Sequence, residues 1–236
     1  MLLALLGVVL LPATAEARGR RAVPDIRTPR TVQPAARSST ITVGLTVHVA
    51  SEDGVPITTR RQIAMWIERA NRALAPHDLQ VQLHRIVSMT GYTEVTRPRD
   101  RRDLASMAQH DGTIHLFVTE SLDPRRPLVR RRVRGLHWRY HGLGRGLRQR
   151  EFVVVTLGAP KTTLAHEVGH LMGLRHSSSE DNIMCSCRRG GDTTFTREQG
   201  ELMRQGARRF ESRQQQARQR AENQRYRSLD RARRRR

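Results

Sequence analysis

The hydrophobic positions divide the middle of the chain into strands and helices. Residues 41–50 alternate between apolar and polar side chains, which is the pattern of a half-buried strand. Residues 57–74 carry apolar side chains at spacings of three and four, which predicts an amphipathic helix. Further elements are expected as strands at 79–87, 113–118 and 151–157, a short strand at 136–141, and helices at 101–110 and 196–210.

A further helix follows directly after the apolar strand at 151–157. Pro160 suits its start, because the N–H that proline lacks would have no partner inside the helix. We expect the helix to end near Met172, because Gly173 tolerates the left-handed conformation common just after a helix. The residues with the clearest chemical signature lie on this helix and in the turn that follows it.

The two ends of the chain differ in composition from this middle part. Residues 1–17 join an apolar run to small residues, as in a signal peptide, and the run is shorter than the roughly 20 residues that span a membrane. We therefore expect secretion, or a periplasmic or cell-envelope location, and no transmembrane segment. Residues 18–40 are interpreted as a linker or short pro-segment, 41–206 as the folded domain, and 207–236 as a solvated, mobile, arginine-rich tail.

The formal net charge is +21, from 43 Lys and Arg against 22 Asp and Glu. This charge favours contact with anionic envelope polymers or other polyanions, although an arginine-rich codon bias would produce the same composition. Aromatic residues are sparse in the tail, so no specific nucleic-acid binding is predicted. Cys185 and Cys187 are too close in sequence to connect distant parts of a fold. They are interpreted as small buried residues or a local disulfide. The alternatives are a thiol that controls the candidate site described below, or a covalent link to another chain.

Three histidines and a glutamate form the clearest candidate site. His166 and His170 lie one helical turn apart and can direct two imidazoles at one ion, with Glu167 beside them. The turn at Gly173 lets His176 approach the same ion from the other side. Three histidines that leave a fourth position open are the ligand set of a catalytic zinc, so we expect one Zn²⁺ per chain. Glu167 would then act as the general base toward a zinc-activated water.

The string from His166 to His176 resembles the signature of the metzincin zinc metallopeptidases at every specified position. Metzincins also carry a methionine turn beneath the metal, and Met184 follows His176 at a spacing similar to that in matrixins. The resemblance implies an α+β fold of the metzincin-type zincin kind. Such a fold has a twisted mixed sheet of about five strands packed on helices, an active-site helix and a small C-terminal subdomain. It also implies an endopeptidase that hydrolyses peptide bonds.

The resemblance further suggests where a protein or peptide substrate would bind. In metzincins the substrate lies extended against an edge strand that precedes the catalytic helix. By the order of elements, the candidate edge strand here consists of Leu136, His137, Trp138, Arg139, Tyr140 and His141. It lies within residues 124–150, which hold ten arginines and no acid, so we hypothesise a preference for acidic peptides or for proteins held on anionic envelope polymers. The alternative is that these arginines are merely solvated.

A second interpretation of the whole chain is an arginine-rich polyanion-binding or nucleic-acid-binding protein with a non-catalytic zinc site. Glu167 argues against it, because a purely structural zinc site has no need of a base beside its ligands. We therefore favour a secreted zinc-dependent endopeptidase.

Overall fold

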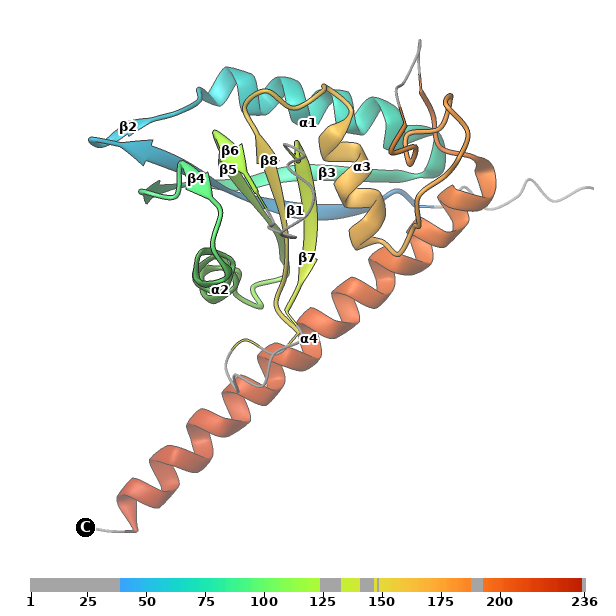
Figure 1. Ribbon diagram of the computed structural model, residues 1–236. Coiled ribbons are helices and arrows are strands. Elements are labelled where there is room, and N and C mark those ends of the chain that lie inside the picture. Colours follow the sequence, from blue (N-terminus) through green and yellow to red (C-terminus); the bar gives the residue numbers. More distant parts are fainter. Residues whose placement is uncertain (1–38, 124–132, 141–146, 148, 188–192, 235–236) are drawn as a thin grey trace, which may run out of the picture. The chain divides into compact units, whose positions relative to one another are not determined.

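A mixed β-sheet forms the centre of the unit that spans Ser38–Arg236 (Figure 1). The computed structural model describes residues 39–123, 133–140, 147, 149–187 and 193–234. Four of its strands are parallel: β3 (Leu79–Thr90), β1 (Ile41–Glu52), β5 (Thr113–Thr119) and β8 (Glu151–Thr156), in that spatial order. The last strand, β7 (Gly135–Arg139), runs antiparallel to β8 and ends the sheet. This arrangement confirms the predicted α+β fold with a mixed sheet.

Three strands of only two residues each were not expected from the sequence. The two-residue strand β2 (Val55–Pro56) pairs with the end of β1. Strands β4 (Glu94–Val95) and β6 (Ser121–Leu122) form a separate parallel pair. Two residues are too few for an alternating pattern, so the hydrophobic pattern of the sequence cannot predict these short strands.

Two helices cover one face of the sheet. Helix α1 (Arg60–Leu74) is capped by Thr59, whose hydroxyl accepts a hydrogen bond from the Gln62 N–H at 3.2 Å. The predicted stripe of apolar side chains on α1 is buried, and it packs in one core cluster with helix α3 (Thr163–Leu171) and the odd-numbered residues of β1 and β8. A single 3₁₀ turn, η1 (Ala75–His77), connects α1 to β3.

The other face of the sheet packs against helix α2 (Pro98–Met107). This helix begins three residues earlier than expected, at a proline whose fixed φ suits the first helical position. Phe117, Phe152 and Val154 contribute to this second cluster, because neighbouring residues of a strand point to opposite faces.

The last helix, α4 (Arg197–Arg233), is 37 residues long and differs from the expected helix that ends near residue 210. Its N-terminus is held by a capping box between Thr196 and Gln199. The expected boundary between domain and tail at residue 206 therefore falls inside one helix. Ala207, Phe210 and Gln214 beyond that boundary are buried against the domain.

The composition of the tail explains why α4 continues. Beyond Gly206 the helix contains no Gly or Pro, and it consists mainly of Arg, Gln, Glu and Ala, which are strong helix formers. The prediction of a mobile tail was based on net charge, which does not take this helix propensity into account. Within the described residues, no helix combines the length and the apolar character that a membrane crossing requires.

Candidate active site

The three predicted histidine ligands meet at one point. His166 and His170 lie on α3, and His176 follows the turn after that helix. The Nε2 atom of His170 lies 3.1 Å from Nε2 of His166 and 3.0 Å from Nε2 of His176. Ligand nitrogens of a tetrahedral zinc lie about 3.3 Å apart, because each Zn–N bond is about 2.0–2.1 Å long. The separations therefore fit a single ion of that size.

Backbone carbonyls fix the protonation of two of these rings. His166 donates a hydrogen bond from Nδ1 to the Ile183 carbonyl at 2.6 Å, and His170 donates from Nδ1 to the Leu174 carbonyl at 2.9 Å. A carbonyl oxygen can only accept, so in the neutral rings Nδ1 carries the proton and Nε2 offers a lone pair. Lone pairs that face one another at 3 Å would repel, and a cation between them turns that repulsion into coordination.

The surroundings of His170 keep its ring in the neutral form that binds metals. Burial lowers the pKa of His170, the hydrogen bond to the Leu174 carbonyl opposes this shift, and the charges of His176 and His137 add to it. A neutral imidazole is the ligand form, since a protonated ring has no lone pair to offer.

Gly173 makes the turn that the sequence predicted. Its φ is +102°, in the left-handed region that glycine tolerates best. The Gly173 N–H donates to the His170 carbonyl at 2.9 Å, and the Leu174 N–H donates to the Gly169 carbonyl at 2.9 Å. The turn thus places the Leu174 carbonyl against the ring of His170 and brings His176 to the cluster.

Met184 lies in a tight turn beneath α3, as the methionine turn of the resemblance implied. The Cys185 N–H donates to the Asn182 carbonyl at 2.9 Å, and the Asn182 side chain accepts a hydrogen bond from the Met184 N–H at 2.9 Å. Met184 is fully buried, and its Sδ lies 2.6 Å from where a Cβ on Gly169 would stand. The sulfur therefore packs closely against the backbone of the metal-binding helix.

A cleft of about 900 Å³ opens over the histidine cluster. Glu167 lines it and is 6% exposed. A Cβ at Gly135, the first residue of β7, would lie 2.7 Å from Oε1 of Glu167, so only glycine leaves room for this carboxylate. The predicted base, the predicted ligands and the edge strand thus share one cleft.

Only part of the predicted edge strand lies in this cleft. Leu136 and His137 line it, together with the preceding residues 133–135. Trp138 packs with the cluster on the other face, where the guanidinium of Arg101 lies 4.9 Å from its ring centroid. The part of the chain that lines the cleft therefore begins earlier than the predicted edge strand. The reason is that β7 runs antiparallel to β8, so the first residues of β7 lie beside the start of α3. Tyr140 follows the end of β7, and His141 lies outside the described residues.

The described arginines of residues 124–150 mostly point elsewhere. Arg139 donates to Glu151 at 2.8 Å, and Arg150 donates to the Ala108 carbonyl at 2.8 Å. Arg134 alone of these three lines the cleft, where its guanidinium donates to the Gly158 carbonyl at 2.9 Å. Within the part of the chain that the structure describes, the expected rim of positive charge is reduced to this one side chain.

The lining of the cleft also contains residues whose role the sequence left open. Cys185 and Cys187 form a disulfide next to the methionine turn, which agrees with one of the interpretations given above. Thr162, Thr163 and Thr193 also line the cleft and carried no sequence signal. Single threonines occur throughout the chain, and only the fold selects these three.

Comparison with known proteins agrees with this site. The sequence model of the matrixins matches residues 158–200, and that of the reprolysin-like metallopeptidases (metallo-peptidase family M12B) matches residues 60–177, half of the chain. No curated protein matches the chain.

Three solved structures of proteases share the fold. Metalloproteinase-II from Bacteroides fragilis superposes with a TM-score of 0.52 at 16% identity, covering 73% of this chain and 55% of that one. A promirolysin mutant from Tannerella forsythia gives 0.54 at 15% identity, covering 74% and 84%. Mirolysin in complex with a compound gives 0.53 at 16% identity, covering 74% and 96%. The chain thus spans about half of the Bacteroides protein and most of the two mirolysin chains.

The fold and the three-histidine site define a zinc metallopeptidase of the metzincin class. Within that class, the chain belongs to the reprolysin-like metallopeptidases, whose model covers helix α1, the strands from β3 to β8 and the metal-binding helix. At 15–16% identity the solved structures support the fold and not a substrate.

Proposed function

We propose that this protein is a secreted zinc-dependent endopeptidase. The observation that carries the proposal is the convergence of three Nε2 atoms in a cleft that Glu167 and β7 also line. His166, His170 and His176 would hold one Zn²⁺ per chain. When bound, the ion would lower the pKa of a water molecule and polarise the carbonyl of the scissile bond.

The chain's own groups supply the remaining steps. Glu167 accepts the proton of the attacking water and later delivers it to the leaving amine. Strand β7 ends the sheet, so an extended peptide can add to its outer edge by backbone hydrogen bonds. Gly135 keeps the start of that edge open beside Glu167. The substrate backbone would then pass over the histidine cluster.

Peptide cleavage profiling tests this proposal. The full chain loaded with zinc is incubated with an unbiased peptide library, beside the Glu167→Ala variant and beside wild type treated with a chelator. We expect cleavage by wild type only, restored to the chelated sample by added Zn²⁺. Cleavage by Glu167→Ala at the wild-type rate would overturn the assigned role of Glu167. Absence of cleavage by zinc-loaded wild type would overturn the function itself.

A preference for acidic peptides is supported by Arg134. One exposed ion pair contributes roughly 0–1 kcal/mol, so the expected preference is a few-fold and weakens as salt rises. Profiling at low and high salt, with Arg134→Gln for comparison, measures it. The preference would be disproved if Asp and Glu were no more frequent around the cut than in the library, at either salt concentration and in both proteins. The peptidase proposal would remain intact.

Secretion is proposed from residues 1–17, which lie outside the described residues. Expression of the whole chain in a bacterial host should place the protein outside the cytoplasm, with a mature N-terminus near Arg18. Fractionation and N-terminal sequencing check this expectation, and an intact Met1 in the cytoplasmic fraction would contradict it.

A further inference from the structure

A buried carboxylate connects the substrate edge to the last helix. Glu151 is the first residue of β8, and its side chain is 2% exposed. Its Oε1 accepts hydrogen bonds from His137 Nε2 at 2.9 Å and from Arg139 at 2.8 Å, both on β7. Its Oε2 accepts a hydrogen bond from Arg213 of α4 at 2.9 Å. One carboxylate thus binds two elements that lie far apart in the sequence.

These partners keep Glu151 charged in the interior. Burial alone would raise the pKa of its carboxyl, but the hydrogen bond from His137 and the charges of His137, Arg139 and Arg213 outweigh burial and lower it. A buried charge that loses one partner carries a large penalty, so the remaining groups must rearrange around it. The geometry of the β7 side of this cluster therefore depends on the α4 side.

Glu151 contacts the face of β7 whose first residues line the active-site cleft. Gly135, His137 and Arg139 alternate along the strand and so share one face. At the start of that row Gly135 lies against Glu167, and His137 lines the cleft. The ring of His137 is close enough to His170 for its charge to affect the pKa of that ligand. His137 is therefore the member of this cluster that a bound peptide would meet.

The chemistry of the ring indicates what it offers to a substrate. A carboxylate can only accept, so Nε2 of His137 carries a proton when it bonds to Glu151. That bond turns Nδ1 into the nitrogen that can serve a ligand. No other hydrogen bond of His137 is found within the ranges that the structure describes. Glu151 consequently sets both the tilt of the ring and which nitrogen remains for a ligand.

We propose that Arg213 and Glu151 are positioning residues, which hold His137 as a specificity-determining contact for the substrate on β7. The proposal rests on the proposed function and adds to it a role for the part of α4 beyond residue 206. Arg213 holds Oε2, which leaves Oε1 aligned with His137. Without Arg213, Arg139 can draw both carboxylate oxygens toward its own fork and away from the ring.

A double-mutant cycle tests whether Arg213 acts through His137. Zinc-loaded wild type, Arg213→Ala, His137→Ala and the double variant are compared on one peptide found by profiling. We expect each single change to raise KM about tenfold, with kcat within about twofold, because each removes a substrate-binding contact and leaves Glu167 and the metal ligands in place. The double variant should lose no more than His137→Ala does. Losses that multiply in the double variant would overturn the coupling.

Matched variants separate positioning from general loss of structure. Arg220→Ala removes an exposed arginine of the same helix and should behave as wild type. Arg213→Lys keeps the charge but loses the fork, so it should recover part of the lost affinity. Should Arg213→Ala fold poorly, judged by thermal unfolding and zinc content, Arg213→Lys and His137→Ala still carry the comparison. Equal KM values for Arg213→Ala and Arg220→Ala in the folded proteins would overturn the proposal.

Binding without turnover separates this inference from the proposed function. In a Glu167→Ala background, calorimetry measures the Kd of the same peptide with and without Arg213→Ala. We expect about tenfold weaker binding for the Arg213→Ala form. If wild type cleaves peptides in a Glu167-dependent manner but this Kd is unchanged, only the positioning role fails. If wild type cleaves nothing, the proposed function fails first.

Discussion

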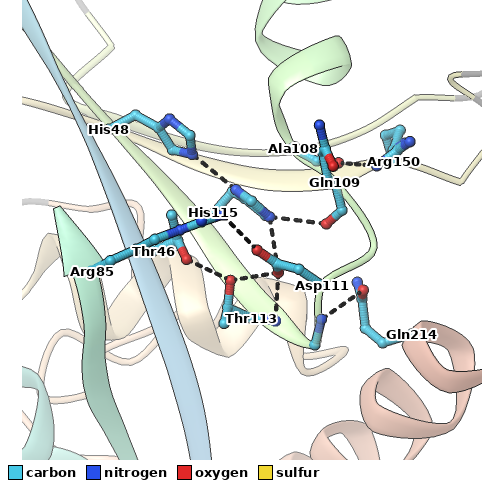
Figure 2. A network of polar contacts seen from close by, with 11 residues as sticks. Thr46, His48, Arg85, Ala108, Gln109, Asp111, Thr113, His115, Arg150 and Gln214 are labelled. Carbon is cyan, nitrogen blue, oxygen red and sulfur yellow. Dashed lines mark hydrogen bonds and ion pairs between the residues drawn. The ribbon is translucent and has the colours of Figure 1, made fainter. Parts of the chain in front are cut away.

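Two histidine clusters lie on opposite faces of the same sheet, and they are built for different purposes. In the active-site cluster, His166 and His170 each give one ring nitrogen to a backbone carbonyl and direct the other at a common point. On the face covered by α2, His115 uses both nitrogens within the protein (Figure 2). Its Nδ1 lies 2.9 Å from His48 Nε2, and its Nε2 lies 2.9 Å from the Gln109 carbonyl.

The acid of the second cluster is equally engaged. Asp111 accepts hydrogen bonds from the Thr113 N–H at 3.0 Å, from the Thr113 hydroxyl at 2.7 Å and from Arg85 at 3.0 Å. His115 adds an ion-pair contact at 3.2 Å when it is protonated. A buried histidine can serve as a metal ligand only when one of its nitrogens remains available, so the number of histidines in a cluster does not by itself make a metal site. The second cluster serves to join β1, β5 and the turn before β5.

Removal of one histidine from each cluster should break the comparison most visibly. His170→Ala deletes a metal ligand. Its loss should cost more than the 10–100-fold in metal affinity that follows when a group supporting a ligand is removed. His115→Ala should leave the zinc content unchanged, although it removes the hydrogen-bond partner of His48 and one contact of Asp111 and lowers stability. Elemental analysis of the purified full chains measures the bound metal. Stoichiometric zinc in His170→Ala would contradict the ligand assignment.

The base in the active-site cluster should be separable from the ligands. Glu167→Gln keeps the size of the side chain and should retain zinc, but kcat should fall by roughly 10²–10⁴-fold, as for other general bases. Steady-state kinetics on a profiled peptide, with zinc content measured in parallel, check this. Turnover at the wild-type rate would contradict the role of Glu167 while leaving the metal site in place.

The sequence predicted the active-site cluster because its members are close along the chain. His166, His170, Gly173 and His176 follow one helix and one turn, so their spacing alone defines the geometry. Met184 came from the family resemblance at a fixed distance from the last ligand. The long strands and α1 were equally predictable from the sequence, because a buried face requires apolar residues at regular spacing.

The clusters that the sequence missed depend on contacts between distant segments. His48 and His115 lie 67 positions apart, and Arg213 lies 62 positions from Glu151. Each of these residues in isolation is an ordinary polar residue beside a strand or on a helix, and only the sheet order brings them together. The length of α4 was missed for another reason, because net charge was taken as a sign of mobility although arginine and glutamine favour helices.

The second cluster should reveal itself through the pH dependence of stability. The pKa of His48 is lowered from 6.5 to about 4, mainly by burial and further by the charges of His115 and Arg85. The charge of Asp111 opposes this shift but does not outweigh it. Between these two values the unfolded chain binds more protons than the folded one, so the free energy of unfolding decreases as the pH falls. The expected loss from pH 7 to pH 4 is on the order of 3 kcal/mol.

The His48→Gln variant isolates this contribution. Glutamine can still donate to His115 but does not titrate, so the variant should lose less stability than wild type over the same interval. His77, His110 and His170 also have lowered pKa values, and the difference between the two proteins cancels their effect. At still lower pH the stability supplied by Asp111, whose pKa is also lowered, is lost in both proteins. Urea unfolding at several pH values measures the slopes, and identical slopes would disprove the assignment to His48.

Met184→Leu should produce the smallest effect and sharpens the boundary of the active-site cluster. Met184 contacts the cluster only through packing, since its Sδ lies against Gly169 while the rings above it are oriented by the carbonyls of Ile183 and Leu174. Leucine has nearly the same volume, so the loss in free energy of unfolding should stay below about 1.5 kcal/mol.

The branched side chain must fit beneath a helix where no Cβ is tolerated, and a small shift of α3 would move both ligands together. Zinc content should therefore stay stoichiometric while kcat changes by less than about tenfold. Cobalt substitution provides the spectroscopic check: identical spectra of wild type and Met184→Leu are expected, and a sulfur-to-metal band that disappears in the variant would show that Met184 is a ligand.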